Sequence, residues 1–405
     1  MRNYLIVTGG YWAFTITDGA IRMLVVLYFH QLGYSPFEVA MLFLFYEIFG
    51  IVTNLVGGWL GARIGLNLTM HIGMGMQVVA LMMLTVPDAW LSVPYVMLAQ
   101  ALSGIAKDLN KMSAKASVKA LTGGGGESRL FKYVAVLTGS KNAHKGAGFF
   151  VGAALLQGDG FRGALAVLAG TLFAVLVATA VMLPTGVGKM KSKPKFTLVF
   201  SITAAINWLS AARFFLFGSR DVWFVVGLPV FLSGVLGWSY MQVGGFLAVW
   251  VIGYGFVQAA APRLLRRSHR GQGPGGGTAR LWALFLAAFP AGIALALMQG
   301  LPPGPVLMVG LILFGIVFAI NSAVHSYLIL AYSDFEKVSM NVGFYYMANA
   351  GGRLMGTVLS GLVYQTQGLE GCLWWSAGFV LAALALSLKL PEVSPGTTRA
   401  ASHHV

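Results

Sequence analysis

The stretch LGYSPFEVAMLFLF, residues 32–45, recurs in related form as LGWSYMQVGGFLAV at residues 236–249. The second copy begins 204 residues after the first, which is close to half of the 405-residue chain. The segments that follow correspond as well, because GGWLGARIG at 57–65 matches the position of APRLLRRS at 261–268. This repeat predicts two halves of the same topology, related as a parallel repeat.

Composition predicts that the chain lies in a membrane. Hydrophobic residues make up 57% of the sequence, charged residues only 10%, and the mean hydropathy is +0.77. A soluble globular protein is usually about one quarter charged. Apolar runs of about 20 residues, the length needed to cross a bilayer, recur along the chain. We therefore expect an all-α integral membrane protein with twelve transmembrane helices in two six-helix halves.

The apolar runs predict the domain organisation. We place the spans at approximately 4–30, 37–60, 68–87, 92–117, 130–156, 163–184, 203–235, 241–262, 281–299, 304–331, 340–365 and 371–390. Residues 1–184 then form the first half, 185–196 a cytoplasmic linker, 197–392 the second half and 393–405 a tail. The seventh segment is long and interrupted by charges, so we expect either an entry helix followed by a span or one irregular helix.

The basic residues predict the orientation. Of the 27 lysines and arginines, eighteen fall in one set of loops and ends, Arg162 alone falls in the opposite set, and eight fall within spans. By the positive-inside rule, both termini are cytoplasmic. The net charge of +15 is therefore a topology signal and does not indicate nucleic-acid binding. The single Cys372 excludes an internal disulfide framework and a cysteine metal cluster.

Twelve charged residues within the predicted spans are the candidate functional groups. The bases are Arg22, Lys107, Lys111, Lys141, Lys145, Arg213, Arg220 and Arg353, and the acids are Asp18, Glu47, Asp108 and Asp221. Eight bases against four acids leave a net interior charge of +4. A basic side chain at mid-bilayer costs at least about 2.5 kcal/mol, so such residues normally face the bundle interior or a wet cavity.

Four lysines follow one another at four-residue intervals in the fourth span: Lys107, Lys111, Lys115 and Lys119. On a helix they climb about 18 Å within an arc of about 120°. Two such charges about 6 Å apart repel by about 3 kcal/mol at an effective dielectric of 20, unless an anion binds or one lysine is neutral. We interpret the inner pair as a central anion site and the outer pair as snorkelling lysines. For Asp108 we expect an ion pair with a neighbouring helix.

The fifth and eleventh spans carry matching polar groups. In LTGSKNAHKGAGFF, residues 137–150, Lys141 and Lys145 lie four apart. Arg353 follows Lys145 by 208 residues, which is close to the repeat offset, so we expect the two bases at equal depth in the membrane. Bases at equal depth in the two halves predict a clamp that holds an anion from both sides. The alternative is glycine-mediated helix packing with one buried ion pair. Further polar candidates in these two spans are Asn142, His144 and Asn349.

The remaining interior groups leave alternatives open. Asp18 and Arg22 lie four apart and either neutralise each other or exchange partners when a substrate or proton arrives. Glu47 has no base beside it in the sequence, so it is a candidate proton carrier, against a structural hydrogen bond. For His325 a satisfied polar contact competes with a role in binding. Arg213 and Arg220 are secondary candidates for substrate contact.

Motifs of soluble chemistry are absent from the sequence. It contains no phosphate-binding GxxxxGK[ST], no HExxH and no GxSxG. We therefore expect neither an enzyme nor a protein that needs a cofactor or a metal.

A short loop resembles a superfamily motif. GGWLGARIGLN, residues 57–67, is similar to the G-x-L-x-D-R-x-G-R-K loop of the major facilitator superfamily. The positions in register are Gly58, Leu60, Arg63 and Gly65. Ala62 replaces the acid of the motif, and Leu66 and Asn67 replace its final basic pair, so the charge latch of the motif is in doubt here. The resemblance implies a transporter.

Longer stretches resemble a narrower family, the organoarsenical efflux permeases of bacterial arsenic-resistance operons. They are residues 3–25, 103–119, 137–150 and 212–232. The resemblance implies a protein of the bacterial inner membrane that exports 1-arseno-3-phosphoglycerate. It also implies a functional pairing with glyceraldehyde-3-phosphate dehydrogenase, which forms this compound from arsenate.

That substrate carries two separated anionic groups, which agrees with the interior cations. We expect a monomer in the lipid bilayer that binds a small organic anion. The alternatives are a carrier for another organic phosphate or carboxylate, and a membrane sensor or scaffold that does not transport. The sequence leaves proton antiport, anion exchange and facilitated diffusion open as the energy coupling.

Overall fold

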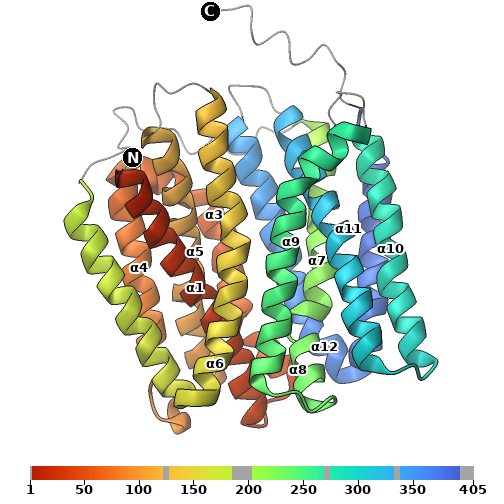
Figure 1. The fold of residues 1–405 in the computed structure, drawn as a ribbon, viewed down its shortest axis with the longest axis horizontal. Helices are drawn as coiled ribbons and strands as arrows, with labels where there is room; N and C mark the ends of the chain where they lie inside the picture. The colour runs from red at the N-terminus through yellow and green to blue at the C-terminus, as the bar shows by residue number, and fades with distance from the viewer. Residues whose placement is uncertain (1, 122–126, 185–202, 269–273, 333–337, 393–405) are drawn as a thin grey trace, which may run out of the picture. The chain divides into compact units, whose positions relative to one another are not determined.

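The computed structural model describes residues 2–121, 127–184, 203–268, 274–332 and 338–392, and all regular structure in these ranges is helical (Figure 1). The helices are α1 (Arg2–Gln31), α2 (Pro36–Met41), α3 (Leu44–Ile64), α4 (Leu66–Met83), the 3₁₀ turn η1 (Asp88–Trp90), α5 (Val93–Leu121), α6 (Glu127–Met182), α7 (Ala204–Phe224), α8 (Gly227–Gly234), α9 (Tyr240–Ser268), α10 (Gly276–Met298), α11 (Pro303–Ala331) and α12 (Val338–Ser387). The predicted linker, the tail, and the side chains of residues 57–63 and 115–139 lie outside the described part.

The predicted membrane fold is confirmed. Nine helical segments in the described ranges are long and apolar enough to cross a membrane. The two longest, Ser140–Met182 with 43 residues and Gly343–Ser387 with 45, are each twice the length of one crossing. Each is broken by a glycine at positive φ, Gly160 (70°) and Gly368 (69°), where a side chain would be strained. With α5 added, these segments account for the twelve predicted spans.

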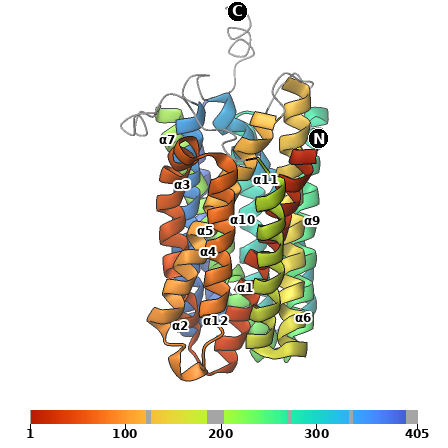
Figure 2. The ribbon, with the colours of Figure 1, turned by 90° about the vertical axis from the view of Figure 1, so that its left-hand side faces the viewer.

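At Gly160 the long helix α6 doubles back on itself (Figure 1). The helices α1, α3, α4, α5 and α6 run side by side along a common direction (Figure 2). These helices carry apolar side chains buried in the contacts between helices and others exposed on the outside, as expected for a bundle in lipid.

The chain divides into two compact units, which are described separately below. The first unit comprises Met1–Phe196 and Pro229–Gly255, and the second comprises Thr197–Leu228 and Phe256–Val405. This grouping by contact assigns residues 229–255 to the first unit, whereas the predicted halves follow the sequence repeat. The predicted domain boundaries remain a prediction.

The seventh predicted span is one irregular helix, the second of the two alternatives. α7 ends at Phe224 and α8 begins at Gly227, just before Pro229. Proline lacks an N–H donor and disfavours helical backbone in the residue before it. The backbone N–H groups of Val226 and Gly227 donate to Oγ of Ser360, both at 3.1 Å, which satisfies donors at the break.

Glycines bring two helix pairs into backbone contact. In the first unit, a Cβ at Gly148 of α6 would lie 2.3 Å from the carbonyl oxygen of Ile16 in α1. In the second unit, a Cβ at Gly352 of α12 would lie 2.0 Å from the carbonyl oxygen of Phe214 in α7. No side chain fits at these distances, so each pair of helices is held at backbone contact by glycine.

Replacing Gly148 by alanine is therefore expected to destabilise the protein by about 1 to 3 kcal/mol, because the methyl group forces α1 and α6 apart. The matched control is Gly170→Ala, also in α6, where nothing lies within 4 Å of the added Cβ. The control is expected to gain stability through helix propensity. Thermal unfolding of both variants in detergent tests the contact, and equal unfolding temperatures would contradict it.

Candidate functional site

Two carboxylates of the first unit are held by bases from other helices. Nη2 of Arg22 in α1 donates to Oε1 of Glu47 in α3 at 2.9 Å, and the Glu47 carboxylate is 0% exposed. Glu47 therefore has a basic partner in the fold, although none lies beside it in the sequence. Asp18, one turn before Arg22, forms its ion pair with Nζ of Lys145 in α6 at 3.8 Å.

Tyr46 connects these two ion pairs, and sequence reasoning missed it. Its hydroxyl donates to Oδ1 of Asp18 at 2.6 Å. The ammonium of Lys107 lies 4.0 Å from its ring centroid, and the Arg22 guanidinium lies 5.0 Å from it. A tyrosine within an apolar run gives no signal except its position beside Glu47.

The inner lysines of the ladder share one carboxylate. Asp108 lies 2.6 Å from Nζ of Lys111 and 3.7 Å from Nζ of Lys107. Both lysines are on α5, so these pairs differ from the expected pairing of Asp108 with a neighbouring helix. Residues three apart on a helix lie side by side, which brings Lys111 within reach. Asp108 thereby offsets the repulsion between the lysines. Lys111 also donates to Oδ1 of Asn54 at 2.8 Å, a contact that the sequence did not indicate.

The turn of α6 that carries Ser140 and His144 packs against Trp12 of α1. Nε1 of Trp12 donates to Oγ of Ser140 at 2.8 Å, and the indole stacks on the His144 ring with centroids 4.5 Å apart. Lys141 and Asn142 lie half-buried on the same turn. The predicted candidates of this span are thus brought together on α6, with His144 held by an aromatic ring.

In the second unit, one carboxylate holds two arginines. Nε of Arg220 donates to Oδ1 of Asp221 at 2.6 Å, and Nε of Arg353 donates to Oδ2 at 3.1 Å. Asp221 is 1% exposed, and both arginines are largely buried. The carboxylate therefore has an arginine on each oxygen, an arrangement favoured by the forked guanidinium.

The two units contain corresponding ion pairs. Asp18 of α1 contacts Lys145 of α6, and Asp221 of α7 contacts Arg353 of α12. The acids are 203 residues apart and the bases 208 residues apart, close to the repeat offset. Each of these helix pairs also contains one of the glycine contacts described above. The glycine packing and the buried ion pair of the alternative interpretation are both present, and the clamp across the repeat remains a prediction.

Arg213 of α7 has a different environment. Its Nε donates to Oδ1 of Asn349 at 2.9 Å, and Nη1 donates to the carbonyl oxygen and Oγ of Ser322 at 3.2 and 3.1 Å. The guanidinium lies 3.9 Å from the ring centroid of Phe217, and Arg213 is 4% exposed. Within the described ranges, all of its partners are neutral. By contrast, the interior bases that contact a carboxylate are Arg22, Lys107, Lys111, Lys145, Arg220 and Arg353.

His325 lies one turn after Ser322 on α11 and is 1% exposed. Its Nδ1 is buried and has no hydrogen-bond partner among the described residues. The expectation of a satisfied polar contact is therefore not met at this nitrogen. Ser322, which precedes His325 by three residues on the same helix, accepts hydrogen bonds from Arg213, so the fold brings α11 near the guanidinium at this level.

The charge balance is the same in both units. The first unit contains five interior bases and three acids, and the second contains three bases and one acid. Each unit therefore has an excess of two positive charges within its membrane-spanning helices. In a medium of low effective dielectric, such an excess attracts an anion strongly.

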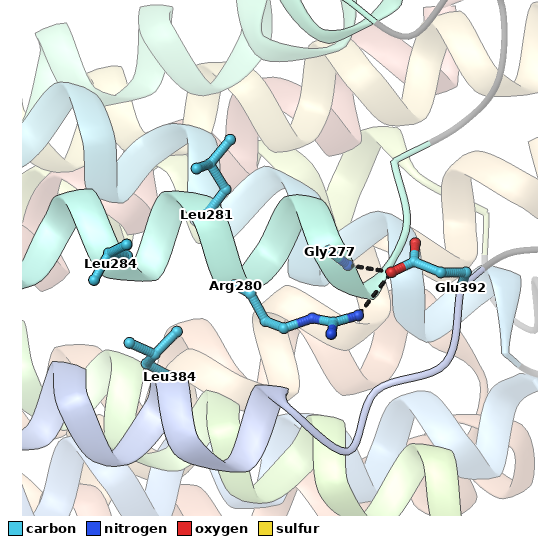
Figure 3. A pocket seen from close by; sticks show the side chains of 6 residues that line it. All are labelled: Gly277, Arg280, Leu281, Leu284, Leu384 and Glu392. Carbon is cyan, nitrogen blue, oxygen red and sulfur yellow. Dashed lines mark hydrogen bonds and ion pairs between the residues drawn. The ribbon is translucent and has the colours of Figure 1, made fainter.

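A surface pocket lies at one end of α10 (Figure 3). Its lining residues are Gly277, Arg280, Leu281, Leu284, Leu384 and Glu392. Oε1 of Glu392 accepts hydrogen bonds from the Gly277 N–H at 2.6 Å and from Arg280 at 2.7 Å. The charges of this pocket neutralise each other, and none of the predicted site residues lines it.

Comparisons with known proteins agree with this architecture. A family model described as Major Facilitator Superfamily matches residues 7–329. A structure described as "Structural insights into substrate recognition in proton dependent oligopeptide transporters" is similar with a TM-score of 0.70 at 16% identity, covering 96% of this chain and 97% of that chain. A second, described as "Selectivity mechanism of a bacterial homologue of the human drug peptide transporters PepT1 and PepT2", has a TM-score of 0.68 at 16% identity, with coverage of 95% and 96%. At this identity the likeness shows the fold alone. A comparison with curated protein sequences gives no match.

Proposed function

Because the chain belongs to the major facilitator superfamily, we propose that it is a secondary transporter for a small organic anion with more than one negative charge. The observation that carries this proposal is the excess of two positive charges within the spans of each unit. Buried charges are costly in a membrane and usually serve a substrate or ion pathway. An excess of two charges balances one dianionic group, so the two units together match a substrate with two such groups.

The specific substrate that we propose is 1-arseno-3-phosphoglycerate, exported to the outside with a gain in arsenate resistance. It has an arsenate and a phosphate group separated by a three-carbon chain, which fits two separated cationic regions. In this proposal the protein lies in the bacterial inner membrane with both termini in the cytoplasm. Glyceraldehyde-3-phosphate dehydrogenase supplies the substrate from arsenate and needs no contact with the transporter.

The acid-held bases suggest how binding is coupled to movement. Asp18 and Asp221 act as internal counter-ions for Lys145 and Arg353. An anionic substrate that contacts these bases competes with the two carboxylates and weakens their ion pairs. The same exchange changes a contact between helices, because one ion pair joins α1 to α6 and the other joins α7 to α12.

Expression in arsenate-sensitive bacteria together with the dehydrogenase is expected to raise arsenate resistance and to deplete the arsenical from washed cells. Cells that express either protein alone are the controls, because both formation and export of the compound are needed. Unchanged resistance with retained arsenical would contradict this substrate.

The second candidate is a carrier for another organic phosphate or carboxylate, favoured by the same cation excess. Everted membrane vesicles distinguish the two through uptake of labelled 3-phosphoglycerate or a dicarboxylate. A sensor or scaffold would show no flux of any of these. Loss of uptake when the proton gradient is collapsed would support proton coupling through Asp18, Glu47, Asp108 or Asp221.

A further inference from the structure

Arg213 is a buried cation whose partners in the described part of the chain are all neutral. An arginine does not lose its proton in a protein, so its charge persists in the interior. A buried charge is normally balanced by a counter-ion because neutral hydrogen bonds replace only part of its lost hydration. The environment of Arg213 is therefore incomplete as a structural site.

The guanidinium also has hydrogen-bonding capacity to spare. Its bonds to Asn349 and Ser322 use Nε and Nη1, and the structure shows no partner for Nη2 among the described residues. Oγ of Ser322 also accepts a hydrogen bond from Nε2 of Gln258 at 3.2 Å, which fixes its position. The ring centroids of Phe217 and Tyr345 lie 3.9 and 5.0 Å from the guanidinium carbon, so a ligand would reach the guanidinium at its Nη2 edge.

A second, independent feature lies on α11, one turn from the Ser322 partner of Arg213. His325 is three residues after Ser322 on α11, and residues with this spacing share one helix face. Its Nδ1 is buried without a hydrogen-bond partner in the described ranges, so it is a polar atom that lacks a ligand. Within the described residues, α7 and α11 therefore carry a guanidinium nitrogen and an imidazole nitrogen without a hydrogen-bond partner, and Ser322 links the two helices between them.

We propose that Arg213, together with Ser322, His325 and Asn349, forms a subsite that binds one tetrahedral oxyanion, a phosphate or an arsenate group. This inference rests on the proposed function and assigns one end of the anion to a specific place. The forked guanidinium donates two parallel hydrogen bonds to such a group, with the imidazole N–H as a further donor. Arg220 and Arg353 are less suited to form this subsite because the Asp221 carboxylate already neutralises part of their charge.

The variant Asn349→Asp tests the subsite directly. Oδ1 of Asn349 lies 2.9 Å from Nε of Arg213, so an aspartate of the same shape gives Arg213 a permanent counter-ion. The protein is expected to keep or raise its unfolding temperature, while binding of an oxyanion weakens at least tenfold. The control is Gln299→Glu, which adds the same charge at an exposed position at the end of α10. The control is expected to bind as the wild type does.

Binding is measured by calorimetry on the full-length protein in an uncharged detergent free of phosphate, with inorganic phosphate, arsenate and 3-phosphoglycerate as probes. The absence of phospholipid headgroups means that any anion bound comes from the added probe. His325→Gln is a second variant, which keeps Arg213 intact and is expected to weaken binding several-fold.

The outcomes separate the two proposals. If the wild type binds the probes and Asn349→Asp binds them equally well, the subsite is wrong while anion transport stands. If His325→Gln alone leaves the affinity unchanged, the histidine has no part in the subsite. If the wild type binds none of the three probes, the proposed transport of phosphate or arsenate compounds fails, and the subsite fails with it.

Discussion

Replacing Asp221 by asparagine is expected to lower the stability of the protein by roughly 3 to 5 kcal/mol. This carboxylate contacts both Arg220 and Arg353 and is 1% exposed, so its loss removes a charged partner from two largely buried guanidinium groups. Arginine does not relieve such a loss by giving up its proton. The measurement is thermal unfolding of the purified protein in detergent, with urea unfolding as a second probe.

The control for this variant is Asp88→Asn. Asp88 also accepts from an arginine, Arg162, at 2.9 Å, but both side chains are about half exposed. Removal of such an exposed pair typically costs about 0 to 1 kcal/mol. Equal unfolding temperatures for the Asp221 and Asp88 variants would show that Asp221 is not the counter-ion on which the second unit depends.

A related variant distinguishes lysine from arginine. In Asp108→Asn, the bases that lose a carboxylate partner are Lys107 and Lys111, and an ammonium on a flexible stem turns to another acceptor more readily than a planar guanidinium does. We therefore expect a smaller loss of stability than for Asp221→Asn.

Replacing Lys107 or Lys111 by glutamine is expected to weaken anion binding by roughly 2 kcal/mol, about thirtyfold. Each change removes one of the two charges that surround Asp108, and the remaining lysine is then neutralised by that carboxylate. The local excess of positive charge disappears. Lys119→Gln is expected to have little effect because this lysine is at the end of α5.

Vesicle transport of an organic phosphate by each variant measures this effect, with membrane abundance checked by immunoblot. Lys111→Gln also loses the contact with Asn54, so Asn54→Ala serves as a control for that hydrogen bond. Equal transport by the Lys107, Lys111 and Lys119 variants at equal abundance would remove the inner lysines from the site.

The sequence by itself determined the class of fold. Hydropathy sets which segments lie in lipid, and this property is local, so each span is recognisable from its own residues. The repeat at residues 32–45 and 236–249 predicted the doubled topology. The interior charges were also predictable as a set, because a charged residue within an apolar segment is recognisable without knowing the orientation of its helix.

The tertiary structure alone decided which of these charges are paired. Arg22 meets Glu47 across 25 residues, and Arg213 meets Asn349 across 136, separations at which spacing along one helix gives no information. Neutral partners such as Tyr46, Asn54 and Ser322 carry no charge and follow no period, so the sequence did not single them out. Spacing along α5 did place Lys111 beside Asp108, yet that pair was missed because a partner on another helix was expected.

The physical reason lies in how helices contact one another. Composition fixes that a helix is buried in lipid, but its rotation and height depend on the surfaces that meet, such as Gly148 on Ile16 and Gly352 on Phe214. A rotation of a few tens of degrees would exchange the partners of every buried charge without changing the hydropathy of any segment. The excess of positive charge is therefore a property of the sequence, whereas the neutral partners that surround Arg213 in the described part of the chain are a property of the fold.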